Sequence, residues 1–465
     1  MQRKLFGFLF LLFPFIVISQ NVEITGNAAF FANEEIEVLH YSNRISSDLE
    51  LLLKKDISDG GNYNLQLQIE KPTELIIRIE MREFPIKVHP NTIIEINFLP
   101  IENADNQKVP LRTGIKYLKH PTNTATIFDY QNLELNFAHY QMQIQLGQKI
   151  LSLYSPYFDS LEIQYAAILK TDTFFLHHYT YFKAKAMLQT GKSHKEIFDH
   201  YFKGKEILYQ QDNYLDLFSS ITGMRLYNYF KKNLPKTQKA VTQYQVYEQL
   251  KRLISEDSVF LLPEVQNLAL LFYSMHPKPI SEISVTTWPS VINQMANFCP
   301  YSEIKNAAFS IQSKKHRFER GNEAPIIKLL NTQGELKSLT DFRGRYTYLG
   351  FINSKSRTCV QDVIVTSQIK KKYSKVNYVF VICDRDSLEM QNLPKESSNL
   401  RYLFIDKDYA SLKEYEIWNF PVYYLLDKHG YFLQSPAERP MDIVDDFAIL
   451  FAKKTKRRSY EIIKE

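Results

Sequence analysis

The spacing of apolar residues changes twice along this 465-residue chain, and those changes restrict its fold more than any other feature. Residues from 22 to about 100 alternate polar and apolar side chains, as in NYNLQLQI at 62–69, with turn signals between short runs. A period of two predicts strands, and several short strands with regular turns are typical of an antiparallel β-sandwich. We expect this sandwich to occupy residues 20–125.

The middle of the chain has a helical period instead. Apolar residues in the segments 177–189 and 213–232 recur at spacings of three and four, and prolines divide the region into several stretches. An α-helical domain is therefore predicted over residues 126–318. The adjacent His177 and His178 would point about 100° apart on a helix, so they cannot bind one metal ion together, and we expect no metal site.

The last third alternates between strand and helix patterns. Four apolar runs have the length and flanking turns of buried strands: 347–353, 376–383, 401–406 and 421–427. Helices are expected from Cys359 to about residue 374 and from 441 to about 456. This alternation is typical of an α/β domain, expected here over residues 319–465. The chain is thus predicted to be multidomain, with a β-sandwich, an α-helical middle and a C-terminal α/β domain.

The first 19 residues have the three parts of a secretory signal peptide. Arg3 and Lys4 form a basic start, residues 5–18 form an apolar run, and Val17 and Ser19 fit a cleavage site after Ser19. We expect export to a periplasm as a soluble protein with no membrane span. An uncleaved N-terminal anchor is the alternative, although the run is shorter than the roughly 20 residues that a span needs.

Charge and cysteine content further limit the classes of function that the chain can have. The net charge of +6 is modest, and we interpret the basic run at 453–458 as a solvated helix end, so no nucleic-acid partner is expected. Export would permit disulfides, but Cys299, Cys359 and Cys383 are too few for a disulfide framework. The sequence contains no GxSxG, Walker or zinc-spacing motif, and we expect no cofactor.

Three segments of the last third occur in a characteristic order: GNEAP at 321–325, NTQGELKSLTDFRGRYTYLGFIN at 331–353 and WNFPVYYLLDKHG at 418–430. Together they resemble the thioredoxin-fold family, most closely its exported TlpA-like branch, whose relatives include thiol-disulfide reductases and peroxiredoxins. The resemblance covers about residues 319–458 and implies a thioredoxin-like fold for the α/β domain.

In that family a turn between a strand and a helix carries the motif CxxC. The matching stretch here reads FINSKSRTCVQD. By this resemblance Ser356 takes the place of the first cysteine, Arg357 and Thr358 fill the spacer, and Cys359 takes the place of the second. The resemblance thus implies a degenerate SxxC motif.

Two further positions follow from the same resemblance. Pro421, preceded by Phe420, matches the cis-proline of the family, and Asp362 matches an acidic residue that often follows the motif. Backbone groups before a cis-proline lie at a strand edge and can pair with an extended segment. We therefore expect a protein or peptide partner at the face near Pro421.

The serine decides the preferred interpretation. In a dithiol enzyme the first cysteine attacks the substrate as a thiolate and the second releases the product. Serine supplies no comparable anion at neutral pH, although it caps a helix well. We expect Ser356 to keep the fold and remove dithiol exchange, which leaves a binding or assembly role in the cell envelope, with Cys359 as a buried apolar residue.

Two alternatives stay open for Cys359. In the first alternative, Cys359 is the single reactive thiol of an oxidoreductase or peroxidase. SxxC resembles the TxxC of peroxiredoxins, and Arg357 would favour a thiolate. Against it, Ile352 stands where peroxiredoxins have a proline, and their arginine near the position of Pro421 is missing. In the second, Cys359 forms a disulfide with Cys383, which requires Cα atoms within about 7 Å.

Overall fold

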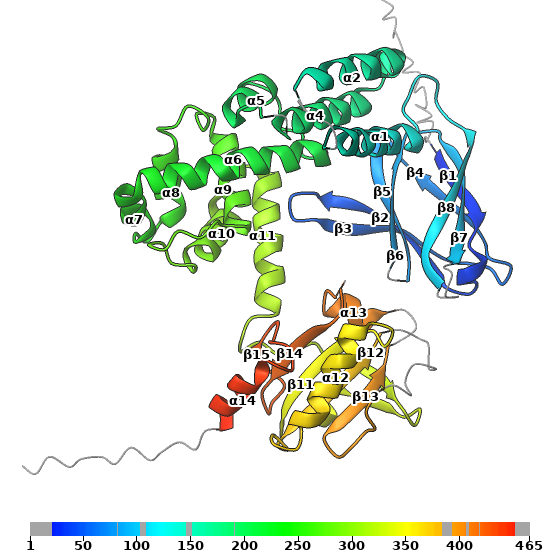
Figure 1. Cartoon of the computed structure of the whole chain (residues 1–465), viewed down its shortest axis with the longest axis vertical. Helices are drawn as coiled ribbons and strands as arrows, with labels where there is room; N and C mark the ends of the chain where they lie inside the picture. The colour runs from blue at the N-terminus through cyan, green and yellow to red at the C-terminus, as the bar shows by residue number, and fades with distance from the viewer. Residues whose placement is uncertain are drawn as a thin grey trace, which may run out of the picture. The chain divides into compact units, whose positions relative to one another are not determined.

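The computed structural model describes residues 21–80, 82–102, 108–145, 151–189, 191–383, 393–405, 409–417 and 419–451. The chain divides into two compact units, Met1–Ala308 (unit 1) and Phe309–Glu465 (unit 2), and the division falls within a helix. Figure 1 colours unit 1 from blue to green and unit 2 from yellow to red. The signal peptide expected at 1–19 and the basic run at 453–458 lie outside the described residues.

Unit 1 begins with two four-stranded sheets, ordered β4-β1-β7-β8 and β3-β2-β5-β6. The strands are β1 (Asn21–Asn27), β2 (Glu35–Asn43), β3 (Asp48–Asp56), β4 (Asn62–Gln68), β5 (Thr73–Ile79), β6 (Arg82–Val88), β7 (Ile93–Glu102) and β8 (Lys108–Lys119). Alternating apolar residues of both sheets, such as Val22, Val38 and Leu65, are buried in one shared core. The alternation seen in the sequence therefore builds two sheets around a common interior.

One strand pair differs from the antiparallel arrangement that the sequence predicts. β1 pairs with β7 in parallel, with Ile24 opposite Ile94, whereas it pairs with β4 in antiparallel fashion. A parallel pair cannot be joined by a short hairpin. Here the chain passes through the strands of the other sheet between β1 and β7, so turn signals between neighbouring strands carry no information about this pairing.

Helices fill the rest of unit 1. They are α1 (Ile127–Gln145), α2 (Leu151–Gln164), α3 (Ala166–Thr171), α4 (Thr173–Gln189), α5 (His194–Tyr201), α6 (Asp212–Lys232), α7 (Leu234–Val241), α8 (Val246–Ile254), α9 (Pro263–Met275), α10 (Thr287–Phe298) and α11 (Ser302–Arg317). The two segments with a clear helical period fall in α4 and α6, where Tyr214 stacks on Phe218. Within the described ranges, none of the helices is long and apolar enough to cross a membrane.

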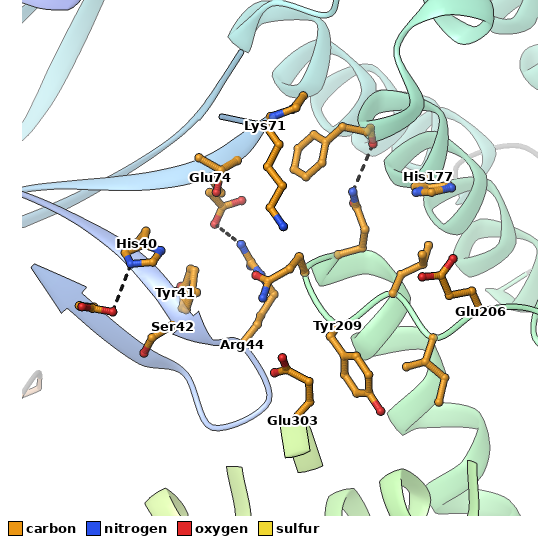
Figure 2. Close-up of a pocket in the computed structure, with 18 residues that line it drawn as sticks. His40, Tyr41, Ser42, Arg44, Lys71, Glu74, His177, Glu206, Tyr209 and Glu303 are labelled. Carbon is orange, nitrogen blue, oxygen red and sulfur yellow. Dashed lines mark hydrogen bonds and ion pairs between the residues drawn. The ribbon is translucent and has the colours of Figure 1, made fainter. Parts of the chain in front are cut away.

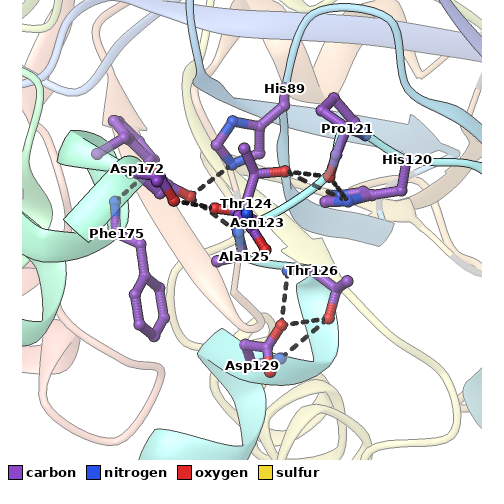
Figure 3. A network of polar contacts seen from close by, with 12 residues as sticks. His89, His120, Pro121, Asn123, Thr124, Ala125, Thr126, Asp129, Asp172 and Phe175 are labelled. Atoms are coloured by element: carbon purple, nitrogen blue, oxygen red, sulfur yellow. Dashed lines mark hydrogen bonds and ion pairs between the residues drawn. The ribbon is translucent and has the colours of Figure 1, made fainter. Parts of the chain in front are cut away.

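A polar network joins the strands of unit 1 to its first helices (Figure 3). Asp172, between α3 and α4, accepts hydrogen bonds from the backbone N–H groups of Ala125 at 2.8 Å and Phe175 at 2.9 Å. Its Oδ2 also lies 3.1 Å from Nε2 of His89, which follows β6, and both side chains are buried. Burial opposes ionisation of Asp172, but these contacts outweigh it and lower its pKa.

Unit 2 contains one seven-stranded sheet, ordered β10-β9-β13-β12-β11-β14-β15. The strands are β9 (Lys328–Asn331), β10 (Leu336–Ser338), β11 (Tyr346–Ile352), β12 (Val376–Ile382), β13 (Leu400–Phe404), β14 (Val422–Leu426) and β15 (Phe432–Gln434). β11, β12 and β13 are parallel, and the other neighbours pair in antiparallel fashion. β11 to β14 overlap the four apolar runs of the sequence.

Helices α12 (Arg357–Ile369) and α14 (Ile443–Phe451) pack on one face of this sheet. Figure 1 shows α12 lying across β11 and β12, and Val363 and Phe447 share a core with Tyr348 and Phe380. The third helix, α13 (Ala410–Glu414), is short. α12 ends before residue 374, where the sequence predicted its end, because the chain turns there to enter β12.

Candidate functional site

The strand–turn–helix stretch at 351–362 is formed by the end of β11 and the start of α12. Ser356 is the N-cap residue of α12, and its Oγ accepts a hydrogen bond at 3.5 Å from the backbone N–H of Cys359. Serine is favourable at this position because its oxygen satisfies one of the unpaired N–H groups of a helix start. Ser356 thus stabilises the helix at the point where the resemblance places the first cysteine of CxxC.

Cys359 lies in the first turn of α12 and is fully buried, with 0% of its surface exposed. It belongs to the core that also contains Val363 and Tyr423. All three cysteines of the chain are among the described residues, each is buried, and none forms a disulfide. The bridge between Cys359 and Cys383 considered above is therefore not formed in this structure. A thiol must reach its substrate to react, and this one is covered.

The Phe420–Pro421 peptide bond is cis, and both residues are half-buried. The register of β11 with β14 sets Phe351 opposite Val422, which directly follows Pro421. Because β11 ends one residue after Phe351, Pro421 lies at the same end of the sheet as the start of α12. The fold therefore brings the serine cap and the cis-proline to one end of β11.

The spacer residues lie on the outside of this end. Arg357 and Thr358 are both exposed on the first turn of α12, while Ser356 is half-buried. An exposed guanidinium and hydroxyl beside an open strand end can donate hydrogen bonds to a bound chain. The arrangement is thus chemically suited to binding, and Cys359 behind it is buried.

Sequence analysis identified Asp362 but missed the residues that hold it. Asp362 is buried, and Arg439 binds both of its oxygens, with Nη2 at 2.7 Å from Oδ1 and Nε at 3.0 Å from Oδ2. The hydroxyl of Tyr423 donates a third hydrogen bond to Oδ2 at 2.8 Å. The resemblance pointed to Asp362 as an acidic residue after the motif, but its partners lie more than 60 positions away in the sequence.

These hydrogen bonds tie α12 to β14 and to the segment before α14. Burial, followed by the hydrogen bond to Asp362, raises the pKa of Tyr423 far above its usual value, so its hydroxyl stays a donor. The ring of Tyr348 stacks on Tyr423 with centroids 5.2 Å apart. Two-pronged arginine–carboxylate pairs fix geometry as well as charge, so the cluster holds the inner side of the candidate site rigid.

Unit 1 has a separate pocket of about 630 Å³ (Figure 2), lined by β2, the start of β5, α4 and the loop before α6. Figure 2 shows side chains of both charges around it, and many pair with one another: Arg44 lies 3.3 Å from Glu74, and His40 lies 3.4 Å from Glu50. Burial lowers the pKa of His177 on the α4 wall. Across the described residues, no group of His, Cys, Asp or Glu is arranged to hold a metal ion.

Comparisons with known proteins bear on the fold. The thiol-disulfide oxidoreductase ResA of Bacillus cereus is 26% identical over 125 residues, which are 26% of this chain and 72% of ResA. The ResA of Bacillus thuringiensis is 25% identical over 125 residues, again 26% of this chain and 72% of that protein. Part of this chain has a thioredoxin-like fold. No family model matches the chain.

Solved structures with the thioredoxin-like fold give similar but weaker matches. The thioredoxin domain of a thiol-disulfide oxidoreductase from Bacteroides vulgatus is 21% identical, with a TM-score of 0.26, and covers 28% of this chain and 97% of that chain. A thioredoxin-like protein from Bacteroides caccae is 16% identical, with a TM-score of 0.31, and covers 60% of this chain and 87% of that chain. At these TM-scores the likeness adds nothing to the sequence matches.

Proposed function

We propose that unit 2 forms the thioredoxin-like fold and that it is a binding domain without dithiol–disulfide exchange. The single observation that carries this proposal is the helix start: Ser356 caps α12, and Cys359 behind it is fully buried. A serine hydroxyl is not ionised at neutral pH, and a covered thiol cannot attack a substrate disulfide. SxxC is on this view a degenerate form of the motif.

The proposed partner is an extended protein or peptide segment bound at the face near Pro421. Support comes from the cis Phe420–Pro421 peptide and from exposed Arg357 and Thr358 at the same end of β11. A segment that pairs with strand backbone gains affinity from main-chain hydrogen bonds, while neighbouring side chains select its sequence. No sulfur chemistry is needed for this binding.

We also propose the domain layout and the location. The signal peptide is residues 1–19, the β-sandwich 20–125, the helical domain 126–318 and the thioredoxin-like domain 319–465. The basic start, apolar run and small-residue cleavage site support export to a periplasm, where the protein would act in the cell envelope. Sequencing the N-terminus of protein recovered from the exported fraction tests this, and a first residue other than Gln20 contradicts the cleavage site.

A second candidate is a thiol oxidoreductase or peroxidase that acts through Cys359 alone. The observation in its favour is that the ResA proteins, to which part of the chain is similar, are thiol-disulfide oxidoreductases. The burial of Cys359 opposes it, because the reacting group must meet peroxide or a disulfide at the protein surface.

Insulin-reduction and peroxide-consumption assays separate the two candidates. We expect no turnover above background for wild type, for Cys359→Ala, or for Cys299→Ala, a matched control at another buried cysteine. Turnover by wild type that disappears in Cys359→Ala and persists in Cys299→Ala would establish the second candidate. The binding role is tested by fluorescence titration with unfolded-protein peptides, where Pro421→Ala should weaken binding about tenfold, the loss of roughly one well-made hydrogen bond to backbone.

The variant Ser356→Cys adds the missing sulfur without changing the size of the side chain much. A thiol at a helix start is activated by the nearby N–H groups and the helix dipole. We expect this variant to gain measurable insulin reduction, with Ser356→Ala as the inactive control. If Ser356→Cys folds and stays inactive, the covered position of Cys359 is a second block on exchange.

A further inference from the structure

A groove of about 450 Å³ lies on unit 2 at the opposite end of the sheet from the start of α12. Three of its lining residues mark the amino ends of the parallel strands: Arg345 precedes β11, Asn377 lies in β12 and Asn399 precedes β13. Ser356 and Pro421 lie at the carboxyl end of β11. The groove is therefore separate from the candidate site described above.

Cationic side chains dominate the lining. Four of them, against one carboxylate, surround the groove: Lys337, Arg343, Arg345 and Arg401, with Asp341 as the acid. The carboxylate of Asp341 is already engaged, because it accepts a hydrogen bond at 3.0 Å from the backbone N–H of Ser338 in a capping box. The groove thus carries an excess of positive charge, because four cations outnumber the single carboxylate of its lining.

Two of the cations have partners outside the lining. Lys337 lies 3.0 Å from Glu335, and Arg343 pairs with Glu323. All four of these side chains are between 39% and 62% exposed. Exposed ion pairs are worth little and rearrange easily, so both cations stay available to a ligand with more charge.

The other two cations have no such partner. In the part of the chain that the structure describes, no carboxylate lies within 4.0 Å of the side-chain nitrogens of Arg345 or Arg401. Arg401 donates through Nη1 to the backbone carbonyls of Ser397 and Leu400. Both side chains are exposed. Both guanidinium groups therefore have N–H groups that a bound anion could accept from.

Lysines at the end of α12 add to this field. The carbonyl of Lys370 accepts a hydrogen bond at 3.2 Å from Nδ2 of Asn399 in the groove, and its Nζ donates to Ser397. Burial, together with the neighbouring charge of Lys371, lowers the pKa of Lys370. Lys370 thus borders the groove, as does Glu335, which accepts a hydrogen bond from Asn331 of the lining. The cations still outnumber the carboxylates, and an excess of one sign attracts anions from solution.

We propose that this groove binds a phosphate group, carried either by a small soluble ligand or by a lipid headgroup. A phosphate concentrates up to two negative charges and several acceptor oxygens in one small tetrahedral group. Guanidinium groups bind such oxyanions with paired, forked hydrogen bonds. An acidic peptide instead spreads single charges along its length and offers fewer acceptor oxygens at any one point.

The test uses the full chain and two kinds of probe. Inorganic pyrophosphate is titrated by calorimetry, and cosedimentation is measured with vesicles of phosphatidylglycerol in phosphatidylcholine. We expect binding to at least one probe, weakened by added salt because the contacts are largely electrostatic. The paired variant Arg345→Gln/Arg401→Gln should lose at least about tenfold in affinity, as expected when charge-assisted hydrogen bonds are removed.

Two further variants sharpen the result. Arg320→Gln removes an exposed arginine next to Gly321, whose N–H bonds to β15 at the far edge of the sheet, and should change affinity less than about twofold. Arg345→Lys/Arg401→Lys keeps the charge but removes the forks, and should give an intermediate loss. It also covers the case in which the glutamine variant fails to fold, which circular dichroism would reveal.

The outcomes of these measurements show which kind of molecule carries the phosphate, or they show that the groove is not a phosphate site. Pyrophosphate binding indicates a soluble ligand, and binding only to anionic vesicles indicates a lipid headgroup; either supports the groove if the arginine variants lose it. The proposal is wrong if neither probe binds, if the paired variants bind as wild type does, or if Arg320→Gln loses as much. Preference for polyglutamate or nucleic acid over both phosphate probes would also overturn it.

Discussion

Asp172 in unit 1 and Asp362 in unit 2 are both buried carboxylates, yet they are held in different ways. Asp172 is bound by two backbone N–H groups and by one histidine. Among the residues that the structure describes, the carboxylate of Asp362 is instead bound by side chains, the guanidinium of Arg439 and the hydroxyl of Tyr423. Backbone donors remain when a side chain is replaced by any residue other than proline, whereas each side-chain donor can be deleted singly.

The difference shows how a fold tolerates a buried charge. When backbone N–H groups hold a buried carboxylate, those donors stay in place after the carboxylate is removed, so they are left unsatisfied. A carboxylate held by side chains depends on its partners, so removing a partner leaves the charge itself uncompensated. Asp172 should therefore be sensitive to its own loss, and Asp362 to the loss of Arg439.

The largest expected effect is that of Asp172→Ala. It leaves two buried backbone N–H groups without their acceptor and His89 without its neighbouring carboxylate, and each unsatisfied buried group costs about 1–3 kcal/mol. We expect a loss of about 3–4 kcal/mol in the free energy of unfolding, measured by urea denaturation.

The matched control is Asp129→Ala. Asp129 is half-buried and accepts hydrogen bonds from the N–H and hydroxyl of Thr126 at the start of α1. Losing this capping contact should cost about 1 kcal/mol. Equal losses for the two variants would contradict the structural role given to the Asp172 network.

The second expected effect is that of Arg439→Met. It leaves Asp362 buried with only the hydrogen bond from Tyr423. Because the Arg439 side chain is 52% exposed, water screens part of the interaction, and we expect a loss of about 2 kcal/mol rather than the 3–5 kcal/mol of a fully buried pair. Thermal and urea unfolding of unit 2 should show the change.

A double variant tests the cause of that loss. Adding Asp362→Asn to Arg439→Met removes the buried charge that has lost its partner, so the double variant should be more stable than Arg439→Met alone. The losses of unfolding free energy for Asp362→Asn and Arg439→Met can instead prove additive. In that case the unpaired charge is not what destabilises Arg439→Met, and the proposed difference between Asp362 and Asp172 is wrong.

A third effect concerns pH. The pKa of Asp172 is lowered in the folded protein, so its ionised form stabilises the fold above the unfolded pKa of about 3.9. This stability is lost as the pH falls through the lower folded value. Wild type should therefore lose stability below about pH 4 more steeply than Asp172→Asn does. Urea midpoints measured from pH 6 downward check this, and parallel curves would refute it.

The smallest expected effect is that of Tyr423→Phe. The change removes one hydrogen bond to Asp362 while the ring can still stack on Tyr348 and the two bonds from Arg439 remain. We expect a loss of about 1 kcal/mol. A loss as large as that of Arg439→Met would mean that the tyrosine, and not the arginine, holds the carboxylate.

Local patterns in the sequence predicted much of this fold. The alternation at 62–69 and the apolar run at 376–383 correspond to β4 and β12, because period and length are properties of neighbouring residues. The segments with helical period correspond to α4 and α6. The parallel pairing of β1 with β7 could not be predicted, since it joins residues about 70 positions apart with no local signal.

The positions of the candidate site were predictable from the two stretches that carry the resemblance, one with Ser356 and Cys359 and one with Phe420 and Pro421. The helix cap that Ser356 forms and the burial of Cys359 are known only from the structure. Arg439 could not be linked to Asp362, because their contact depends on how the chain returns after β15. Arg345 and Arg401 lie more than 50 positions apart in the sequence, and no local pattern indicates that both line one groove.

The length of β11 has a consequence for how unit 2 would work. This strand has seven residues, and at about 3.3 Å per residue its two ends lie roughly 20 Å apart. One end opens to the serine-capped helix and the other to the basic groove. If both proposed ligands bind, they would occupy opposite ends of this strand and would not compete.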